Sequence, residues 1–389
     1  MHYIRFCRPP EVQPGRSHAS VKIVLTITTD LSDSFLSPGI PIQLAVVGAY
    51  TQQKDGKSQL VPVNLIQTNP PTWRAGMRVL KLDLPLPPSQ PIETIQIRPL
   101  NRQLTALSTD DVLPGAQGLI MGVYADMPRP GGGPAPSVCF RSLRLSTGDP
   151  GVVQTLQIEE DLGESIARHI WDSGIVMVSL FADLCFDSTA GTAQKKALPL
   201  LRDILSPQDR ALNILELGCG VGVMGIGLAR ILALRQAKEQ PRILMTDLPE
   251  AEQKARANIA RQADASANLD FEPLDWEDGK DDRFGDQAAS CAWELVALCD
   301  CTYNTDTLPP LVKTLSALHR HSATHSAETG APVNTEVLVA TKLRHSSERI
   351  FFDLMSAEGW AIREQTVLPL PMLDGEAQAV EVYLFGKQG

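Results

Sequence analysis

The chain has 389 residues, of which 43% are apolar and 21% are charged. This length allows two domains that each bury a core, and the composition disfavours a disordered chain or a membrane protein. The formal net charge of −10 argues against nonspecific binding to nucleic acid and suits basic protein segments as partners. We therefore expect no nucleic-acid partner and no membrane partner.

The N-terminus and the cysteines indicate a reducing compartment. Residues 1–10 lack the sustained apolar core and small-residue cleavage site of a secretory signal, and no apolar run reaches 18 residues. The seven cysteines lack C-x-x-C spacing and lie mostly in apolar segments, as reduced, buried thiols do. Cys299 and Cys301 have no matching pair of cysteines or histidines, so we expect no metal site. The prediction is a cytoplasmic or nuclear protein.

Residues 1–127 predict a smaller, β-rich N-terminal domain. Apolar and polar residues alternate at 21–28 and 80–84, which is the period of a half-buried strand. Proline-rich breaks separate these segments from further short apolar stretches, at lengths that exclude long helices. We expect a small antiparallel sandwich or barrel. Its role would be either a structural cap or substrate selection.

Residues 128–137 form a linker rich in proline and glycine. These residues disfavour both helix and sheet, so we place the domain boundary there and assign 138–389 to the second domain. Two apolar segments, 138–145 and 152–158, predict a hairpin that leads into this domain.

Two helices are expected next. Asp161 and Glu164 form a capping-box pattern, which predicts a helix that continues through Trp171. Residues 193–204 predict a second helix. Periodicity alone would place Trp171 in the core.

Residues 212–230 predict a strand, a tight turn and a helix that together hold a nucleotide-like ligand. The apolar run 214–217 ends in Gly218, Gly220 and Gly222 and passes into an apolar helical pattern. Glycine lacks a Cβ, so the backbone can adopt positive φ and lie against an adenosine-bearing ligand at the helix N-terminus.

Two ligand classes use such a turn. Residues 220–225 satisfy G-x-G-x-x-G, and Asp247 follows at a distance that suits a ribose contact in a dinucleotide-binding fold. Glu216, however, lies two residues before Gly218, which resembles motif I of class I S-adenosylmethionine (SAM) methyltransferases. An acid at this strand end helps to hold a cationic sulfonium ligand and would repel a diphosphate. The turn therefore favours SAM over a nicotinamide cofactor.

The rest of the chain alternates strands and helices, as in a doubly wound sheet. Residues 321–334 are expected to form a polar surface insertion. The expected strands are 243–245, 269–274, 295–299 and 336–341, the expected helices are 250–262, 308–320 and 347–358, and the closing hairpin is 365–370 with 379–385.

Three of these strand ends carry candidate site residues. Asp247, after the second strand, suits the two ribose hydroxyls of an adenosine, or else caps the next helix. Trp276, after the third strand, suits either an adenine face or the core. The fourth strand ends at Asp300-Cys-Thr-Tyr303, at the edge of the sheet where ligands of this fold bind.

These motifs together resemble the family-16 methyltransferases, which include the methyltransferase-like-21 type protein lysine methyltransferases. The resemblance runs from about residue 138 to the C-terminus. It implies a seven-stranded, Rossmann-like class I methyltransferase sheet, with SAM as the methyl donor and S-adenosyl-L-homocysteine as the product. The matching residues, in the order of the family's motifs, are Glu216–Gly222, Thr246–Pro249, Leu274–Trp276, Asp300–Tyr303 and Val380–Phe385.

The resemblance also implies site residues. Cys299 stands where the family usually has a small residue, and Asp300 and Tyr303 match the family's D-x-x-Y motif, where acceptor and donor meet. The residues expected to contact SAM are Trp171, Glu216, Gly218, Cys219, Gly220, Gly222, Asp247, Trp276 and Cys299.

The chemistry of the acceptor suggests roles for Asp300 and Tyr303. A lysine amine has a pKa of about 10.4 and must be neutral to attack the methyl group, and burial beside the sulfonium lowers that pKa. Asp300 and Tyr303 would orient the amine, although a buried Asp300 also suits a structural cap. We expect methyl transfer to a lysine of a protein substrate. The alternatives are another side chain such as histidine, a small molecule, or a SAM-binding adaptor without catalysis. The substrate protein, the methylation state and the oligomeric state stay open.

Overall fold

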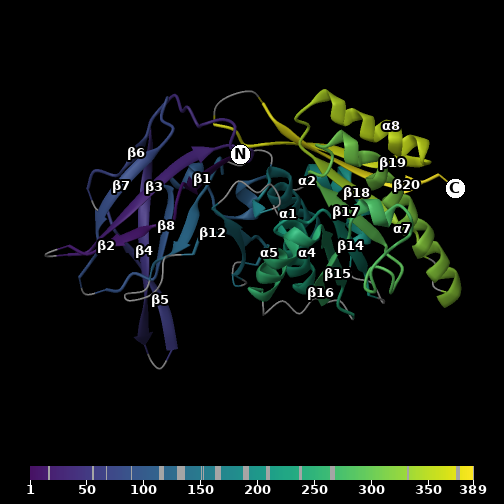
Figure 1. The fold of residues 1–389 in the computed structure, drawn as a ribbon, viewed down its shortest axis with the longest axis horizontal. Helices are drawn as coiled ribbons and strands as arrows, with labels where there is room; N and C mark the ends of the chain where they lie inside the picture. The colour runs from purple at the N-terminus through teal and green to yellow at the C-terminus, as the bar shows by residue number, and fades with distance from the viewer. Residues whose placement is uncertain are drawn as a thin grey trace. The chain divides into compact units, whose positions relative to one another are not determined.

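Contacts within the chain divide it into two compact units (Figure 1). The first comprises Met1–Leu143, Gln157–Ser165 and Pro371–Ala377, and the second comprises Arg144–Leu156, Ile166–Leu370 and Gln378–Gly389. The computed structural model describes residues 1–15, 18–54, 57–66, 68–88, 90–113, 118–128, 136–149, 151, 153–162, 168–186, 192–206, 211–235, 239–262, 268–330, 333–373 and 377–388.

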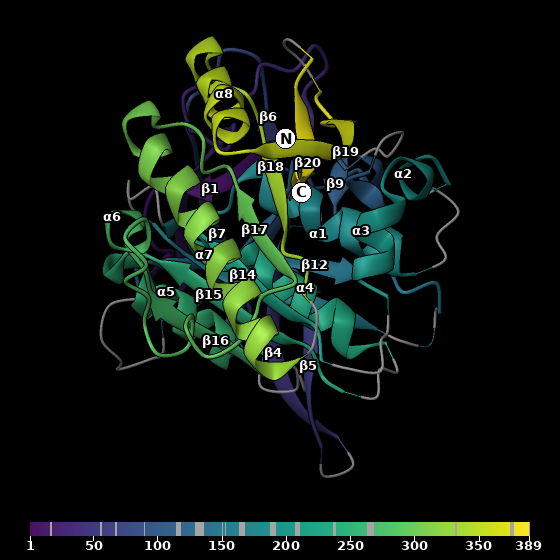
Figure 2. The same cartoon turned by 90° about the vertical axis from the view of Figure 1, so that its right-hand side faces the viewer.

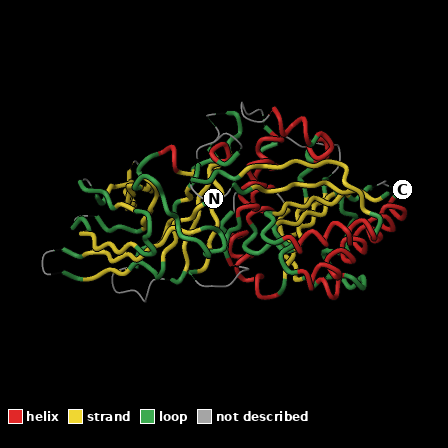
Figure 3. The backbone as a smooth tube through the Cα atoms, turned by 90° about the horizontal axis from the view of Figure 1, so that it is seen from above, coloured by secondary structure: helices red, strands yellow, loops and turns green. Residues whose placement is uncertain are grey.

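The first unit is built from two β-sheets, and Figure 3 shows strands and loops as its main components. One sheet has the strand order β2-β3-β1-β10-β9, with β7 paired to β3, and the other has the order β13-β12-β11-β8-β4-β5, with β6 paired to β4. The strands are β1 His2–Phe6, β2 Glu11–Gln13, β3 Ser20–Thr28, β4 Ile42–Lys54, β5 Lys57–Asn64, β6 Thr72–Trp73, β7 Leu80–Pro85, β8 Thr94–Pro99, β9 Thr105–Ala106, β10 Ile120–Met121, β11 Val123–Asp126, β12 Val138–Leu145 and β13 Gln154–Asp161.

Side chains from both sheets share one hydrophobic core. Burial alternates along β3, so Ile23 and Leu25 point inward, and they belong to the same core cluster as Val46 and Ile97 of the other sheet. This confirms the predicted β-rich domain and its sandwich-like layering. One detail differs from the prediction, because β10 pairs in parallel with both β1 and β9. That sheet is therefore mixed.

The strands predicted to begin the second domain lie in the sheet of the first unit. Strand β12 pairs with β11, where Phe140 lies opposite Tyr124, and β13 continues the same sheet. The reason is burial, since Cys139, Arg141 and Leu143 alternate on the buried face of β12. A hairpin on its own is marginally stable and gains a core by joining a sheet. Of the predicted linker, residues 129–135 lie outside the described residues.

A buried arginine lies at the centre of the first unit. Nε of Arg141 donates to Oε1 of Glu160 at 2.7 Å, and Nη1 donates to the carbonyl oxygens of Ile4 at 2.7 Å and Gly122 at 2.9 Å. Its guanidinium carbon lies 5.5 Å from the centre of the Tyr3 ring. These contacts tie β12, β13, β1 and the start of β11 together, because a buried charge requires a partner and filled donors.

The second unit contains a seven-stranded sheet with the order β16-β15-β14-β17-β18-β20-β19. The five strands β14 to β18 run parallel, and β20 is antiparallel to both of its neighbours. This confirms the predicted Rossmann-like sheet with its closing hairpin. The strands are β14 Asn213–Leu217, β15 Arg242–Asp247, β16 Asn268–Pro273, β17 Leu295–Cys299, β18 Glu336–Thr341, β19 Trp360–Pro369 and β20 Ala379–Lys387.

Helices cover both faces of this sheet (Figure 2). In β14, Leu215 and Leu217 face a core shared with Leu311 of α7 and Phe351 of α8. Because side chains alternate along a strand, Glu216 faces the opposite side, where α1 and α4 pack together. The helices are α1 Asp172–Cys185, α2 Thr192–Ala197, α3 Pro199–Ile204, α4 Val223–Ala233, α5 Pro249–Ala260, α6 Trp276–Gly279, α7 Leu308–Thr329 and α8 Ile350–Ala357.

The helix predicted from Asp161 is wrong at its start. Strand β13 ends at Asp161, and α1 begins at Asp172. Leu156, Ile158 and Glu160 are buried in alternation, which is a strand period that the capping-box pattern does not override. Its second member, Glu164, lies outside the described residues.

The polar segment predicted as a surface insertion is largely helical. Helix α7 continues to Thr329 and ends before Gly330, which has a left-handed φ of 71°. Ser322 and Ser326 are buried within it, and the Ser326 hydroxyl accepts the N–H of Val333 at 2.9 Å. Small polar residues therefore pack on the helix's inner face, which the composition did not reveal.

In the described part of the chain, no helix is long and apolar enough to cross a membrane. No group of three or more histidine, cysteine or acidic side chains among these residues is placed to hold a metal ion. All seven cysteines are free thiols.

Loss of the Glu160 carboxylate is expected to destabilise the first unit. Glu160→Ala leaves the buried Arg141 without its ion-pair partner, which costs about 3–5 kcal/mol. The control is Glu11→Ala, because Glu11 pairs with Arg8 at the surface and such pairs contribute less than about 1 kcal/mol. Urea unfolding compares the two variants with the wild type. Similar losses in both variants would contradict a central role for Arg141.

Candidate functional site

The turn after β14 has left-handed backbone at three glycines. The φ angles are 66° at Gly218, 53° at Gly220 and 85° at Gly222, and Gly222 is the N-cap of α4. A Cβ on Gly218 would lie 2.5 Å from Sγ of Cys301. The turn thus requires glycine both for its conformation and for space. Its backbone forms a cradle beside the N-terminus of α4, as the sequence predicted.

Asp247 holds this turn. Its Oδ2 accepts the N–H of Gly220 at 2.7 Å, and its Oδ1 accepts the N–H of Leu248 at 2.7 Å. Burial raises the pKa of the Asp247 carboxyl, and the two backbone N–H groups partly oppose that rise. The N-cap of α5 is Leu248, without a side-chain cap, so Asp247 does not cap that helix. Each carboxylate oxygen can accept a second hydrogen bond, which leaves the ribose contact as a prediction.

Glu216 lies on the face of the sheet that α4 covers. Its side chain is buried and points toward Gly225, where an added Cβ would lie 2.3 Å from its Oε2. Among the described residues, Oε2 has no hydrogen-bond partner. Burial raises the pKa of Glu216 from 4.5 to about 8, and the N–H of Gly225 only partly offsets this rise. Glu216 therefore supports the start of α4, and its contact with a ligand stays a prediction.

Cys219 and Trp276 complete the surroundings of the turn. The N–H of Cys219 donates to the Thr246 carbonyl at 3.0 Å, and burial raises the pKa of its thiol well above the usual range. Trp276 is partly buried against the core of the α7 face, and its Cζ2 would lie 3.4 Å from a Cβ on Gly218. Trp276 thus lies against both the glycine turn and the core. The two predictions for it, a place in the core and a contact with an adenine face, are therefore compatible.

The end of β17 carries the D-x-x-Y turn. Asp300 is buried and has a left-handed φ of 54°. Its Oδ1 accepts the N–H of Lys342 at 2.9 Å and Nη1 of Arg344 at 3.1 Å, and its Oδ2 accepts Nη2 of Arg344 at 3.3 Å. The guanidinium carbon of Arg344 lies 5.1 Å from the centre of the Trp171 ring. Trp171 directly precedes the first residue of α1. Through this contact, Arg344 holds the start of α1 beside the D-x-x-Y turn.

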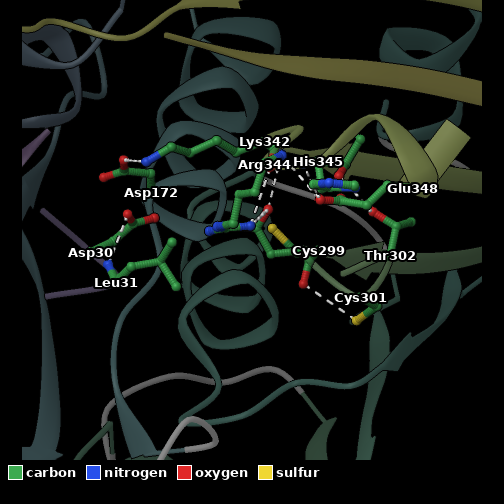
Figure 4. A network of polar contacts seen from close by, with 12 residues as sticks. Asp30, Leu31, Asp172, Cys299, Cys301, Thr302, Lys342, Arg344, His345 and Glu348 are labelled. Atoms are coloured by element: carbon green, nitrogen blue, oxygen red, sulfur yellow. Dashed lines mark hydrogen bonds and ion pairs between the residues drawn. The ribbon is translucent and has the colours of Figure 1, made fainter. Parts of the chain in front are cut away.

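Two cysteines connect the D-x-x-Y turn to the glycine turn. The thiol of Cys301 donates to the carbonyl oxygens of Cys299 at 3.3 Å (Figure 4) and Leu217 at 3.4 Å. Burial raises the pKa of both Cys299 and Cys301, which keeps them as neutral thiols. Cys299 is half-buried and lies at the carboxyl end of β17, as the prediction for it requires.

Tyr303 is the open residue of the motif. Its side chain is 54% exposed, and its hydroxyl makes no hydrogen bond to another of the described residues. Partial burial raises its pKa, and the nearby charge of Asp247 adds to that rise. The hydroxyl therefore remains protonated at neutral pH and is available to a ligand as a donor and an acceptor.

A second polar network lies beside this turn (Figure 4). Nζ of Lys342 contacts Oδ2 of Asp172 at 2.7 Å, with both side chains buried. The hydroxyl of Thr302 lies 2.8 Å from that of Thr341 and donates to Oε2 of Glu348 at 3.1 Å. These contacts join the ends of β17 and β18 to the start of α1. The sequence analysis missed Lys342 and Arg344, and their only signal was a position directly after a parallel strand.

The geometry fits an adenosine-bearing, positively charged cofactor. The glycine turn has left-handed backbone, Asp247 at the end of the neighbouring strand accepts one of its N–H groups, and Glu216 lies buried behind the turn. The carboxyl group of Asp247 beside the turn disfavours a diphosphate. Residues 152–358, more than half of the chain, match a family described as lysine methyltransferase.

The chain belongs to this lysine methyltransferase family. The resemblance drawn from the motifs is thereby confirmed. With its strand order, the methyltransferase has the class I fold and uses SAM as its cofactor. Bound SAM supplies a methyl group made electrophilic by the sulfonium charge.

Individual relatives are distant. A protein of the UPF0665 family from Schizosaccharomyces pombe is 26% identical over 204 residues, which is 52% of this chain and 49% of that protein. The chain therefore matches about half the length of this relative. Among solved structures, a SAM-dependent methyltransferase from Methanosarcina mazei is 12% identical over 49% of this chain and 97% of its own, with a TM-score of 0.32. P. horikoshii TYW2 in complex with MeSAdo is 8% identical over 48% and 61%, with a TM-score of 0.31.

Glu216 should make the stability of the ligand-free methyltransferase depend on pH. Its pKa is higher in the folded protein than in the unfolded chain, so the folded state binds the proton more tightly. The stabilisation is complete below about pH 4.5 and is lost as the pH rises toward about 8.

Glu216→Gln keeps the shape of the side chain but does not ionise. Between about pH 5 and about pH 8, it should lose less unfolding free energy than the wild type does. Denaturant unfolding of both proteins at several pH values measures the difference. Parallel pH dependences would show that Glu216 does not carry the raised pKa.

Proposed function

We propose that this methyltransferase transfers a methyl group from SAM to the side-chain amine of a lysine in a protein. The contact of Cys301 with the backbone beside the glycine turn carries the proposal. It fixes the D-x-x-Y turn directly against the predicted SAM cradle. An acceptor at Tyr303 would therefore lie beside the donor. The family description supports lysine as the acceptor.

The acceptor must lose a proton before it reacts. A free lysine has a pKa of about 10.4, and a site that does not stabilise the ammonium form lowers that value. The cations Arg344 and Lys342 are paired with Asp300 and Asp172. Pairing neutralises these two carboxylates, which weakens their hold on an ammonium ion at this turn.

Tyr303 is suited to orient the neutral amine. Its oxygen can accept one N–H of the amine, so that the nitrogen lone pair points away from Tyr303. Such positioning accounts for much of the rate enhancement of a displacement. Because its pKa is raised, the hydroxyl is not a base at neutral pH. Its exposure suits a long side chain that enters from a protein surface.

The first experiment is transfer of a radiolabelled methyl group from SAM into a cell extract. We expect a discrete labelled protein in which the label maps to lysine, and labelling about tenfold weaker with Asp247→Ala at a limiting SAM concentration. Label on histidine would replace lysine as the acceptor, and label only in the small-molecule fraction would exclude a protein substrate. SAM binding without any transfer would favour an adaptor.

The two halves of the site should respond differently to substitution. Asp247→Ala should weaken SAM binding by about tenfold or more. The substitution removes the carboxylate that accepts the N–H of Gly220 and that is predicted to accept the ribose hydroxyls. Tyr303→Phe should lower turnover by about tenfold or more while SAM affinity changes by less than about twofold.

Calorimetry with SAM and initial rates on the labelled protein separate these effects. Asp247→Asn is the control, because it keeps the shape of the side chain and an acceptor for the Gly220 N–H but removes the charge. Unchanged SAM affinity in Asp247→Ala would remove the ribose assignment. Full turnover in Tyr303→Phe would remove its role at the acceptor.

A further inference from the structure

We propose that Arg344 is a positioning residue and that Asp300 acts through it, not by contact with the acceptor amine. The inference rests on the proposed function, because it assigns roles within the same site. Tyr303 is then the residue of the D-x-x-Y motif that faces the acceptor.

The carboxylate of Asp300 is already engaged on both oxygens. The fork of Arg344 binds it at 3.1 Å and 3.3 Å, and the N–H of Lys342 adds a third hydrogen bond at 2.9 Å. Asp300 is 7% exposed, and the side chain of Arg344 is 15% exposed. If the Asp300 side chain rotated toward an amine, the largely buried guanidinium of Arg344 would lose its ion-pair partner.

Arg344 also contacts the residue predicted to bind SAM. Its guanidinium carbon lies 5.1 Å from the centre of the Trp171 ring. A guanidinium is planar, so it can stack on a ring while its edge binds a carboxylate. One side chain therefore joins the D-x-x-Y turn to Trp171.

Neighbouring contacts fix the position of Arg344. Glu348 accepts the backbone N–H groups of Arg344 at 3.0 Å and His345 at 2.9 Å. Two residues earlier, Lys342 pairs with Asp172, which directly follows Trp171. The segment after β18 is thus anchored both to itself and to the start of α1, as Figure 4 shows for the labelled residues.

Pairing also suits the chemistry of the acceptor. An unpaired carboxylate beside a lysine would stabilise the ammonium form and oppose its attack on the methyl group. Arg344 neutralises Asp300, and Asp172 neutralises Lys342. The turn is therefore held by a carboxylate that does not favour protonation of the acceptor.

The test is a double-mutant cycle with Arg344→Gln and Asp300→Asn in the full chain. The probe for the donor side is S-adenosyl-L-homocysteine, measured by calorimetry, and the probe for the acceptor side is the protein labelled by the wild type. Arg256→Gln is the matched control, because Arg256 also pairs with a carboxylate and lies over a ring, that of Phe271, outside this site. Melting temperatures show which variants fold.

Arg344→Gln should weaken S-adenosyl-L-homocysteine binding by about tenfold, because Trp171 loses its cationic partner. Arg344→Gln should also lower kcat by about tenfold or more, while KM for the substrate protein should change by less than about threefold. Addition of Asp300→Asn should cause no further loss, within about twofold, because the two residues act as a unit. Arg256→Gln should match the wild type.

Two results would overturn the proposal. One is wild-type affinity for S-adenosyl-L-homocysteine in Arg344→Gln. The other is a further tenfold loss of kcat, on the order expected for a lost direct contact, when Asp300→Asn is added. If Arg344→Gln does not fold, Arg344→Lys keeps the charge without the fork and should show the same losses in part. If the wild type labels no lysine, the proposed function fails, whereas the binding data still decide the role of Arg344.

Discussion

The backbone of the glycine turn is held in shape by groups from the two strands that flank β14. Asp247, at the end of β15, accepts the N–H of Gly220, and Cys301, after β17, donates to the Leu217 carbonyl. A turn with positive φ has no side chains of its own to fix it, so its shape depends on such neighbours. The predicted SAM cradle and the proposed acceptor turn are consequently parts of one hydrogen-bonded edge of the sheet.

Charges at this edge are arranged in two different ways. At the D-x-x-Y turn, Arg344 and Lys342 are each paired with a buried aspartate, and the carboxyl group of the buried Glu348 accepts the N–H of Arg344. At the predicted SAM site, Glu216 and Asp247 have carboxyl groups whose pKa values are raised by burial, and a cationic ligand would favour their ionised forms. This arrangement is consistent with the proposed transfer from a cationic donor to a neutral amine.

The first unit is stabilised by a core and a buried ion pair of its own. Its two sheets share a core, and Arg141 satisfies its buried charge with Glu160 and with backbone carbonyls from β1 and the start of β11. The family match starts at residue 152, so the unit lies mostly outside the matched region. Strands β12 and β13 nevertheless lead from its sheet into the second unit.

The sequence by itself determined the order of strands and helices, the glycine turn and the D-x-x-Y motif, because these depend on local periodicity and on residue types at fixed spacing. The extension of α7 and the late start of α1 were beyond it, since burial of Ser322 and pairing of β13 arise from distant parts of the chain. Only the tertiary structure joined Arg344 to Asp300 and Trp171. Asp300 and Arg344 follow two parallel strands, whose ends lie at one edge of the sheet regardless of their distance in sequence, and Trp171 reaches the same place from the start of α1.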